Sequence, residues 1–187
     1  AVANAFGVVN VLNSGVIGDG ATNDSLLFAA ACNSLVDGDA LFIPGGRTYL
    51  LPDGPFNITK SNITIYSDGF PILDFIGGDG INLTGTNQED VTCTGLHFKN
   101  FGAVAFGIPS NGSQDDAFKK RIVVEGNKFT DAEVSSGSVM AVKLTCRMQG
   151  ARVANNHIEN LVTTATTGNP FVYGIAVGRK GDTLAGG

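Results

Sequence analysis

The segment VTCTGLHFKN, residues 91–100, recurs along the chain and decides the predicted fold. It aligns without gaps with ITIYSDGFPI (63–72), IVVEGNKFTD (122–131) and ARVANNHIEN (151–160). One shared position holds Ile65, Cys93, Val124 and Val153, at intervals of 28, 31 and 29 residues, and another holds Phe70, Phe98, Phe129 and Ile158. A nearly constant interval of this length indicates a repeat architecture.

Each repeat contains a strand, a tight bend, a second strand and a variable stretch with a third strand. The bends hold Gly95, Gly126 and Asn155, residue types that tolerate a left-handed backbone. Such a unit buries its apolar side only by stacking on its neighbours, with parallel strands ~4.8 Å apart. The sequence therefore predicts an all-β protein with the fold of a parallel β-helix. An antiparallel β-sandwich with coincidental spacing is the alternative.

Strand alternation predicts which side chains fill the interior. The two aligned apolar columns are expected to point inward, and so is a polar column two residues further on, formed by Asn100, Asp131 and Asn160. Stacked amides can satisfy one another's donors and acceptors along the axis. We interpret this polar column as a structural ladder.

Composition excludes several classes of protein. The net charge of −5 argues against a phosphate-binding surface, so nucleic acid is not an expected partner. No apolar run reaches the ~18 residues of a membrane span. The three cysteines form no CxxC pair and are expected to be buried thiols, while two distant histidines give no metal-ligand spacing. We expect neither a metal nor a cofactor.

The N-terminal stretch VIGDGATNDSLLFAAA, residues 16–31, joins a Gly/Asp turn to an apolar run. Thr22, Asn23 and Asp24 are suited to the start of a helix, which we predict over 22–36. With DGDALFIPGGRTYLL at 37–51, this stretch resembles the N-terminal signature of the pectate-lyase-like superfamily, GxxGDGxTDD followed by G-x-V-x-F-P-x-G-x-Y. Asn23 replaces the usual first Asp of that signature.

The resemblance implies a right-handed parallel β-helix whose first coil is capped by the single helix. Residues 1–187 are then one domain, with coils over 37–187. The C-terminal end shows no matching cap, so we expect a fragment of a longer chain or an end covered by another chain. Polygalacturonases, lyases, epimerases and bacteriophage tailspikes share the signature, which therefore does not fix the activity.

The repeat also predicts an exposed polar face. His97, Lys128 and His157 should stack outward, followed by an outward column of Lys99, Thr130 and Glu159. Such a face can hold an acidic polysaccharide, for which Tyr173 and Phe171 offer aromatic platforms. The alternative is a solvated face without a ligand.

Candidates for catalysis are carboxyl groups, since glycoside hydrolysis requires a pair of them. Asp115 and Asp116 lie in a polar loop, and Glu125, Glu133 and Glu159 lie on or near the strands. We take Asp115, Asp116 and Glu159 as the first candidates. The complete residue sets of polygalacturonases and pectate lyases are absent, which leaves both of these specific activities in doubt.

Three hypotheses for function follow. The first is a tailspike-type receptor-binding protein of a virion, a homotrimer that binds and, as a hydrolase or lyase, depolymerises a bacterial surface polysaccharide. The second is a secreted monomeric polysaccharide hydrolase or lyase. The third is a structural β-helix without catalysis.

Overall fold

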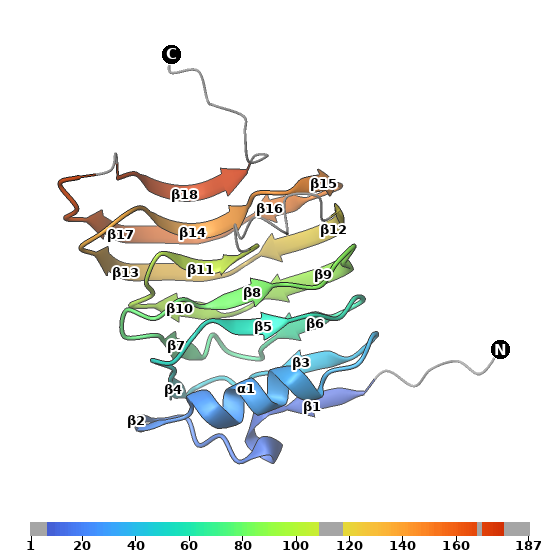
Figure 1. Ribbon diagram of the computed structural model, residues 1–187. Helices are drawn as coiled ribbons and strands as arrows, with labels where there is room; N and C mark the ends of the chain where they lie inside the picture. Colours follow the sequence, from blue (N-terminus) through green and yellow to red (C-terminus); the bar gives the residue numbers. More distant parts are fainter. Residues whose placement is uncertain (1–6, 109–117, 168–169, 178–187) are drawn as a thin grey trace.

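In a computed structural model, which describes residues 7–108, 118–167 and 170–177, the chain forms a parallel β-helix (Figure 1). Three sheets run along it. Sheet A holds β1 (Val8–Asn10), β3 (Ala40–Phe42), β6 (Thr64–Tyr66), β9 (Glu89–Thr94), β12 (Phe118–Glu125), β15 (Arg147–Gln149) and β16 (Arg152–Ala154). Sheet B holds β2 (Asp19–Asn23), β4 (Thr48–Leu50), β7 (Ile72–Asp74), β10 (His97–Lys99), β13 (Lys128–Val134) and β17 (His157–Thr163). Sheet C holds β5 (Phe56–Ile58), β8 (Ile81–Leu83), β11 (Val104–Gly107), β14 (Val139–Leu144) and β18 (Val172–Val177).

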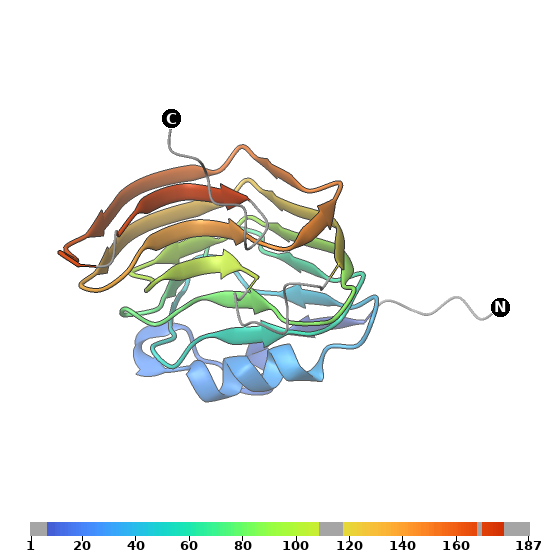
Figure 2. The ribbon, with the colours of Figure 1, turned by 45° about the horizontal axis from the view of Figure 1, so that its top comes forward.

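The chain visits the three sheets in turn, and Figure 2 shows the resulting stack of coils. Every strand pair among the described residues is parallel, which confirms the β-helix and excludes the antiparallel sandwich. Cys93 pairs with Ile65 on one side and Val124 on the other, and Val124 pairs with Val153. The first predicted column therefore has the correct register.

The second column is correct for three of its four members. Phe98, Phe129 and Ile158 are paired, but Phe98 faces Leu73 on the preceding coil and not Phe70. The turn between β6 and β7 is three residues longer than its counterpart between β9 and β10, which a gap-free alignment conceals. Phe70 is consequently outside the core, 49% exposed and with a φ of 47°.

The predicted helix is confirmed but shorter, since α1 spans Ser25–Ser34. It follows β2 and precedes β3, where the other coils have a strand of sheet C, and it packs on β5 and on the 3-10 helix η1 (Val11–Ser14). The Phe28 ring meets Phe56 edge-on at 5.0 Å between centroids. An apolar helix here covers the first coil, whose interior would otherwise be exposed.

The turn before α1 is held in place by the side chain of Asp24. Asp24 is fully buried, and its two carboxylate oxygens accept hydrogen bonds from the amides of Ile17 (2.8 Å) and Gly18 (2.9 Å). Asn23 Oδ1 instead accepts from the Ser25 amide at the helix start. Gly18 has a φ of 68°, and a Cβ there would lie 2.6 Å from the Tyr49 ring. These contacts join the N-terminal turn to the second coil.

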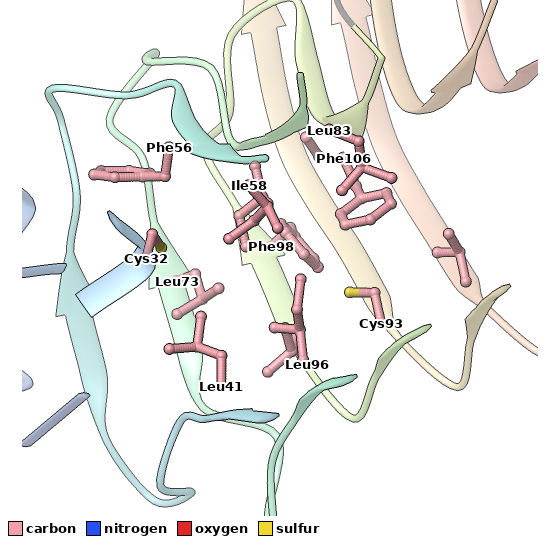
Figure 3. Packing of buried hydrophobic residues seen from close by; sticks show 14 of the residues in the cluster. Cys32, Leu41, Phe56, Ile58, Leu73, Leu83, Cys93, Leu96, Phe98 and Phe106 are labelled. Carbon is pink, nitrogen blue, oxygen red and sulfur yellow. The ribbon is translucent and has the colours of Figure 1, made fainter. Parts of the chain in front are cut away.

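The interior is a continuous stack of apolar side chains, part of which appears in Figure 3. The rings of Phe56, Phe75, Phe98 and Phe129 follow one another at centroid separations of 6.3, 6.0 and 4.9 Å. Phe98 and Phe129 are register partners on neighbouring coils, whereas Phe56 and Phe75 reach the same stack from sheet C and from the residue after β7. The three cysteines are free and buried, as predicted, and burial raises the pKa of the Cys32 thiol to about 12.

The predicted inward polar column is wrong in its direction. Asn100, Asp131 and Asn160 have φ values of 48°, 57° and 53°, and this left-handed backbone turns their side chains outward at the corner after sheet B. They still form ladder contacts, because Asn100 donates to Asp74 (2.9 Å) and Asn160 donates to Asp131 (3.0 Å).

A buried amide ladder lies instead at the corner between sheets A and B. Asn127 is 1% exposed; its Oδ1 accepts from the Leu96 amide, and its Nδ2 donates to the Cys93 carbonyl. Asn127 also donates to Asn156 Oδ1 at 3.1 Å. These amides satisfy backbone groups that the tight bend leaves unpaired.

A lysine is also enclosed by the coils. Lys119, at the start of β12, is fully buried, and its ammonium donates to the Gly85 carbonyl and to Gln88 Oε1 (3.1 Å). Burial lowers the pKa of Lys119 to about 8, an effect that the nearby Cys146 partly offsets. Both oxygens that hold Lys119 are neutral, and no carboxylate of residues 7–108, 118–167 or 170–177 pairs with its ammonium.

Candidate functional site

The outer surface of sheet B is the candidate site, and we refer to it as the sheet-B face. His97 pairs with Lys128, which pairs with His157, and Lys99 pairs with Thr130, which pairs with Glu159. The intervening Phe98 and Phe129 are fully buried, so the flanking side chains of these strands point away from the interior. The structure therefore brings together five of the residues selected from sequence: His97, Lys99, Lys128, His157 and Glu159.

The two lysines of this face have no carboxylate partner. Within the described part of the chain, no Asp or Glu oxygen lies within 4.0 Å of the Lys99 or Lys128 ammonium. The cations of sheet A differ, since Lys120 and Arg121 pair with Glu89, and Arg152 pairs with Glu125 at 3.1 Å. The two ammonium groups of the sheet-B face are thus outside ion pairs with described residues and can bind an anionic group, although acidic residues share the face and the chain as a whole is acidic.

The carboxylates of the same face are already engaged. Asp74 accepts from Asn100, Asp131 accepts from Asn160, and Glu159 lies 3.0 Å from His157 Nε2. The hydrogen bond from Asn160 lowers the pKa of Asp131, which remains ionised at neutral pH. These partners only partly reduce the repulsion between the carboxylates and an incoming anion. The lysines therefore define the position that an anion would take.

His97 lies between the two lysines and is half-buried. Its Nε2 is 2.9 Å from Thr130 Oγ1. Burial, followed by the charges of Lys128 and Lys99, lowers the pKa of His97, so its imidazole is neutral at pH 7. A neutral imidazole can both donate and accept hydrogen bonds, which suits it to sugar hydroxyl groups.

Tyr173, the other predicted binding residue that the structure describes, does not join this face. Asp115 and Asp116 lie outside the described residues. Tyr173 belongs to sheet C, where its ring lies 5.6 Å from that of Phe171. Glu159 is therefore the one of the three first catalytic candidates that the structure describes, and it is exposed beside His157.

Three carboxyl groups have pKa values shifted in the direction opposite to that of a general acid. Asp19, Asp90 and Asp131 all have lowered pKa values, because hydrogen bonds to backbone or side-chain groups stabilise their charged forms. A glycosidase acid requires the opposite shift. Among the described residues, moreover, no three His, Cys, Asp or Glu side chains are grouped so that they could hold a metal ion.

Sequence reasoning missed one residue of this surface. Phe70 was assigned to the core, yet it is exposed, and the Lys128 ammonium lies 5.7 Å from the centroid of its ring. The signal that could have found it is the turn chemistry of Ser67-Asp68-Gly69 before Phe70-Pro71, which fits a longer turn better than a continuing strand.

Comparison with known proteins gives little beyond the architecture. No protein-family model matches the chain, and no curated protein matches it. Among solved structures, ORF18 of Geobacillus virus E2 aligns with 90% of this chain at 16% identity and a TM-score of 0.39. The alignment covers 48% of that viral chain, about half of its length. Among the described residues, no helix is both long and apolar enough to cross a membrane.

Proposed function

We propose that this chain is a tailspike-type receptor-binding protein that binds an anionic bacterial surface polysaccharide along the sheet-B face. The observation that carries the proposal is the pair of unpartnered ammonium groups, Lys99 and Lys128, beside neutral His97. Ammonium groups without a protein carboxylate are the groups that a ligand carboxylate can bind without first breaking an ion pair.

The architecture favours a polymer over a small ligand. Strands of neighbouring coils repeat at ~4.8 Å along the axis, so equivalent polar positions recur along an extended surface. The half-buried imidazole of His97 lies beside Lys128 on the neighbouring strand, and its Nε2 is held by the buried Thr130 hydroxyl at 2.9 Å. A chain of sugars carrying both carboxylates and hydroxyls matches this alternation of charge and neutral donors.

The wider proposal includes a homotrimer, a place in a virion and membership of the pectate-lyase-like superfamily. Its support is the β-helix itself, the capping helix α1 and the Gly/Asp turn held by Asp24. Depolymerisation by Asp115, Asp116 or Glu159 stays part of the same proposal.

A double substitution tests the binding proposal. We expect Lys99→Gln with Lys128→Gln to weaken binding of uronate-containing polysaccharides by about tenfold at low salt, because two ligand carboxylates lose charge-assisted contacts. Isothermal titration calorimetry with alginate, polygalacturonate, hyaluronan and neutral dextran measures this. We expect the wild-type protein to bind at least one of the three acidic polymers and not to bind dextran.

The matched control removes the same charge from sheet A. Lys120→Gln with Arg121→Gln takes away two cations that are paired with carboxylates there. We expect this variant to keep more than half of the wild-type affinity. Equal losses in both variants would show that overall charge governs binding, and an unchanged sheet-B variant would exclude this face as the binding site.

A further inference from the structure

We propose that Phe70, Lys128 and His97 form a subsite for one carboxylated sugar, a uronic acid residue, at the corner between sheets A and B. The inference rests on the proposed function, because it names the sugar class that the sheet-B face recognises. Its basis is the juxtaposition of an exposed ring, an unpaired ammonium and a neutral imidazole.

The first observation is the position of Phe70. The turn between β6 and β7 carries three residues more than the equivalent turn of the next coil, and this places Phe70 on the surface. Phe70 is 49% exposed, so it gains little from core packing, and its φ of 47° is unfavourable for a bulky residue. An exposed aromatic ring offers an apolar surface on which the C–H groups of a sugar ring can pack.

The second observation is that the backbone before Phe70 packs closely on the preceding coil. Gly69 contacts Gly45 there, and a Cβ on Gly45 would lie 2.6 Å from the Gly69 Cα. This close contact fixes the residue next to Phe70 against the preceding coil and holds the turn in place.

The third observation is the direction of Lys128. Lys128 pairs with His97, which pairs with Ile72, so Phe70 belongs to a turn two coils away from Lys128. The ammonium nevertheless lies 5.7 Å from the ring centroid of Phe70, and it has no carboxylate within 4.0 Å among the described residues. A sugar packed on Phe70 therefore has a cation within reach of its substituents.

These groups together match a uronic acid better than a neutral hexose. The ring of the sugar would pack on Phe70, its carboxylate would accept from Lys128, and a hydroxyl would bond to His97. A neutral hexose retains the ring contact and the hydroxyl bond but loses the charge-assisted one. The subsite would therefore discriminate by the substituent at C6 of the sugar.

The test uses the full chain and two monosaccharides, methyl glucuronide and methyl glucoside, with binding followed by proton NMR. The chain has two histidines, His97 and His157, whose ring signals can be assigned with His157→Gln. We expect glucuronide to shift the His97 signal and raise the pKa of His97, since a carboxylate at Lys128 offsets the cations that lower it. Glucoside should bind about tenfold more weakly.

Variants separate the two contacts. Phe70→Ala should weaken glucuronide binding by about fivefold, and Phe70→Leu should weaken it nearly as much because the flat ring is lost. Lys128→Gln should remove the preference for glucuronide over glucoside. The control is Phe42→Ala, which removes a partly exposed aromatic ring from β3 of sheet A and should bind like the wild type.

The outcomes distinguish this inference from the proposal on which it rests. If acidic polysaccharides bind through Lys99 and Lys128 but Phe70→Ala and Phe70→Leu bind glucuronide normally, the subsite is wrong and the binding face stands. If no acidic polysaccharide binds the wild type, both fall. If glucuronide and glucoside bind equally, the assignment to a carboxylated sugar is wrong.

Discussion

Phe98→Ala is expected to lower the free energy of unfolding by about 4 kcal/mol, the largest effect of any substitution considered. Phe98 is fully buried and stacks between Phe75 and Phe129 at centroid separations of 6.0 and 4.9 Å. Truncation leaves a cavity in the middle of the stack, where coils on both sides are held in register and cannot collapse into it. Urea unfolding followed by circular dichroism measures the loss.

The control for this prediction is an aromatic residue outside the stack. Phe171→Ala removes a side chain that is 51% exposed, and we expect it to change the free energy of unfolding by less than about 0.5 kcal/mol. A loss below about 1.5 kcal/mol for Phe98→Ala would contradict a tightly packed interior at this level of the β-helix.

Lys119→Met is expected to change how stability depends on pH. In the wild type the folded state holds the Lys119 proton less tightly than the unfolded chain, with a pKa of about 8 against an ordinary value of 10.5. The unfavourable contribution is therefore complete below pH 8 and disappears as the pH rises toward 10.5. Relative to Lys119→Met, the wild type should gain on the order of 2 kcal/mol between pH 7.5 and 10.5.

The comparison of two proteins is needed because the buried thiols act in the opposite direction. Burial raises the pKa of Cys32 and Cys93, so their contribution to stability is lost as the pH rises above the unfolded thiol value. The loss from Cys32 and Cys93 is common to both proteins and cancels in the difference, whereas the pKa of Cys146 responds to Lys119 itself and forms part of the measured effect. Lys120→Met, which alters a partly exposed lysine paired with Glu89, should follow the wild-type pH curve. If the wild-type and Lys119→Met curves are parallel, Lys119 is not a desolvated cation.

The fold could be predicted because it repeats. A residue position that recurs at nearly constant intervals, such as Cys93 and Val124, reports the register directly, and parallel pairing of successive coils follows from it. The capping helix was predictable from its Gly/Asp turn and apolar run, although the role of Asp24 was not. Asp24 binds backward to the Ile17 and Gly18 amides, a tertiary contact that a helix-capping rule does not describe.

The errors arose where the backbone departs from simple alternation. Phe70 was misplaced because three extra turn residues shift the frame without changing the apolar character of the position. The direction of Asp131 was wrong because a residue with a φ of 57° reverses the expected inward orientation. Lys119 gave no signal at all, since only the enclosure by neighbouring coils distinguishes it from Lys120.

The site was predicted in part for the same reason. The repeat fixes which side chains share a strand face, so the neighbours His97, Lys128 and His157 could be named in advance. Ion pairing depends on the lengths and directions of side chains from other coils, which a repeat does not encode. That Lys128 has no carboxylate partner in the part of the chain that the structure describes, while Arg152 has one, is therefore information that required the structure.

The most direct test of the central claim is an amide chemical-shift map of the isotopically labelled chain with an acidic oligosaccharide that it binds. We predict that the perturbed amides cluster on β7, β10, β13 and β17 and on the turn that carries Phe70, and that the perturbations weaken with added salt. A cluster on sheet A or sheet C, with the amides of Lys99 and Lys128 unchanged, would contradict binding at the sheet-B face.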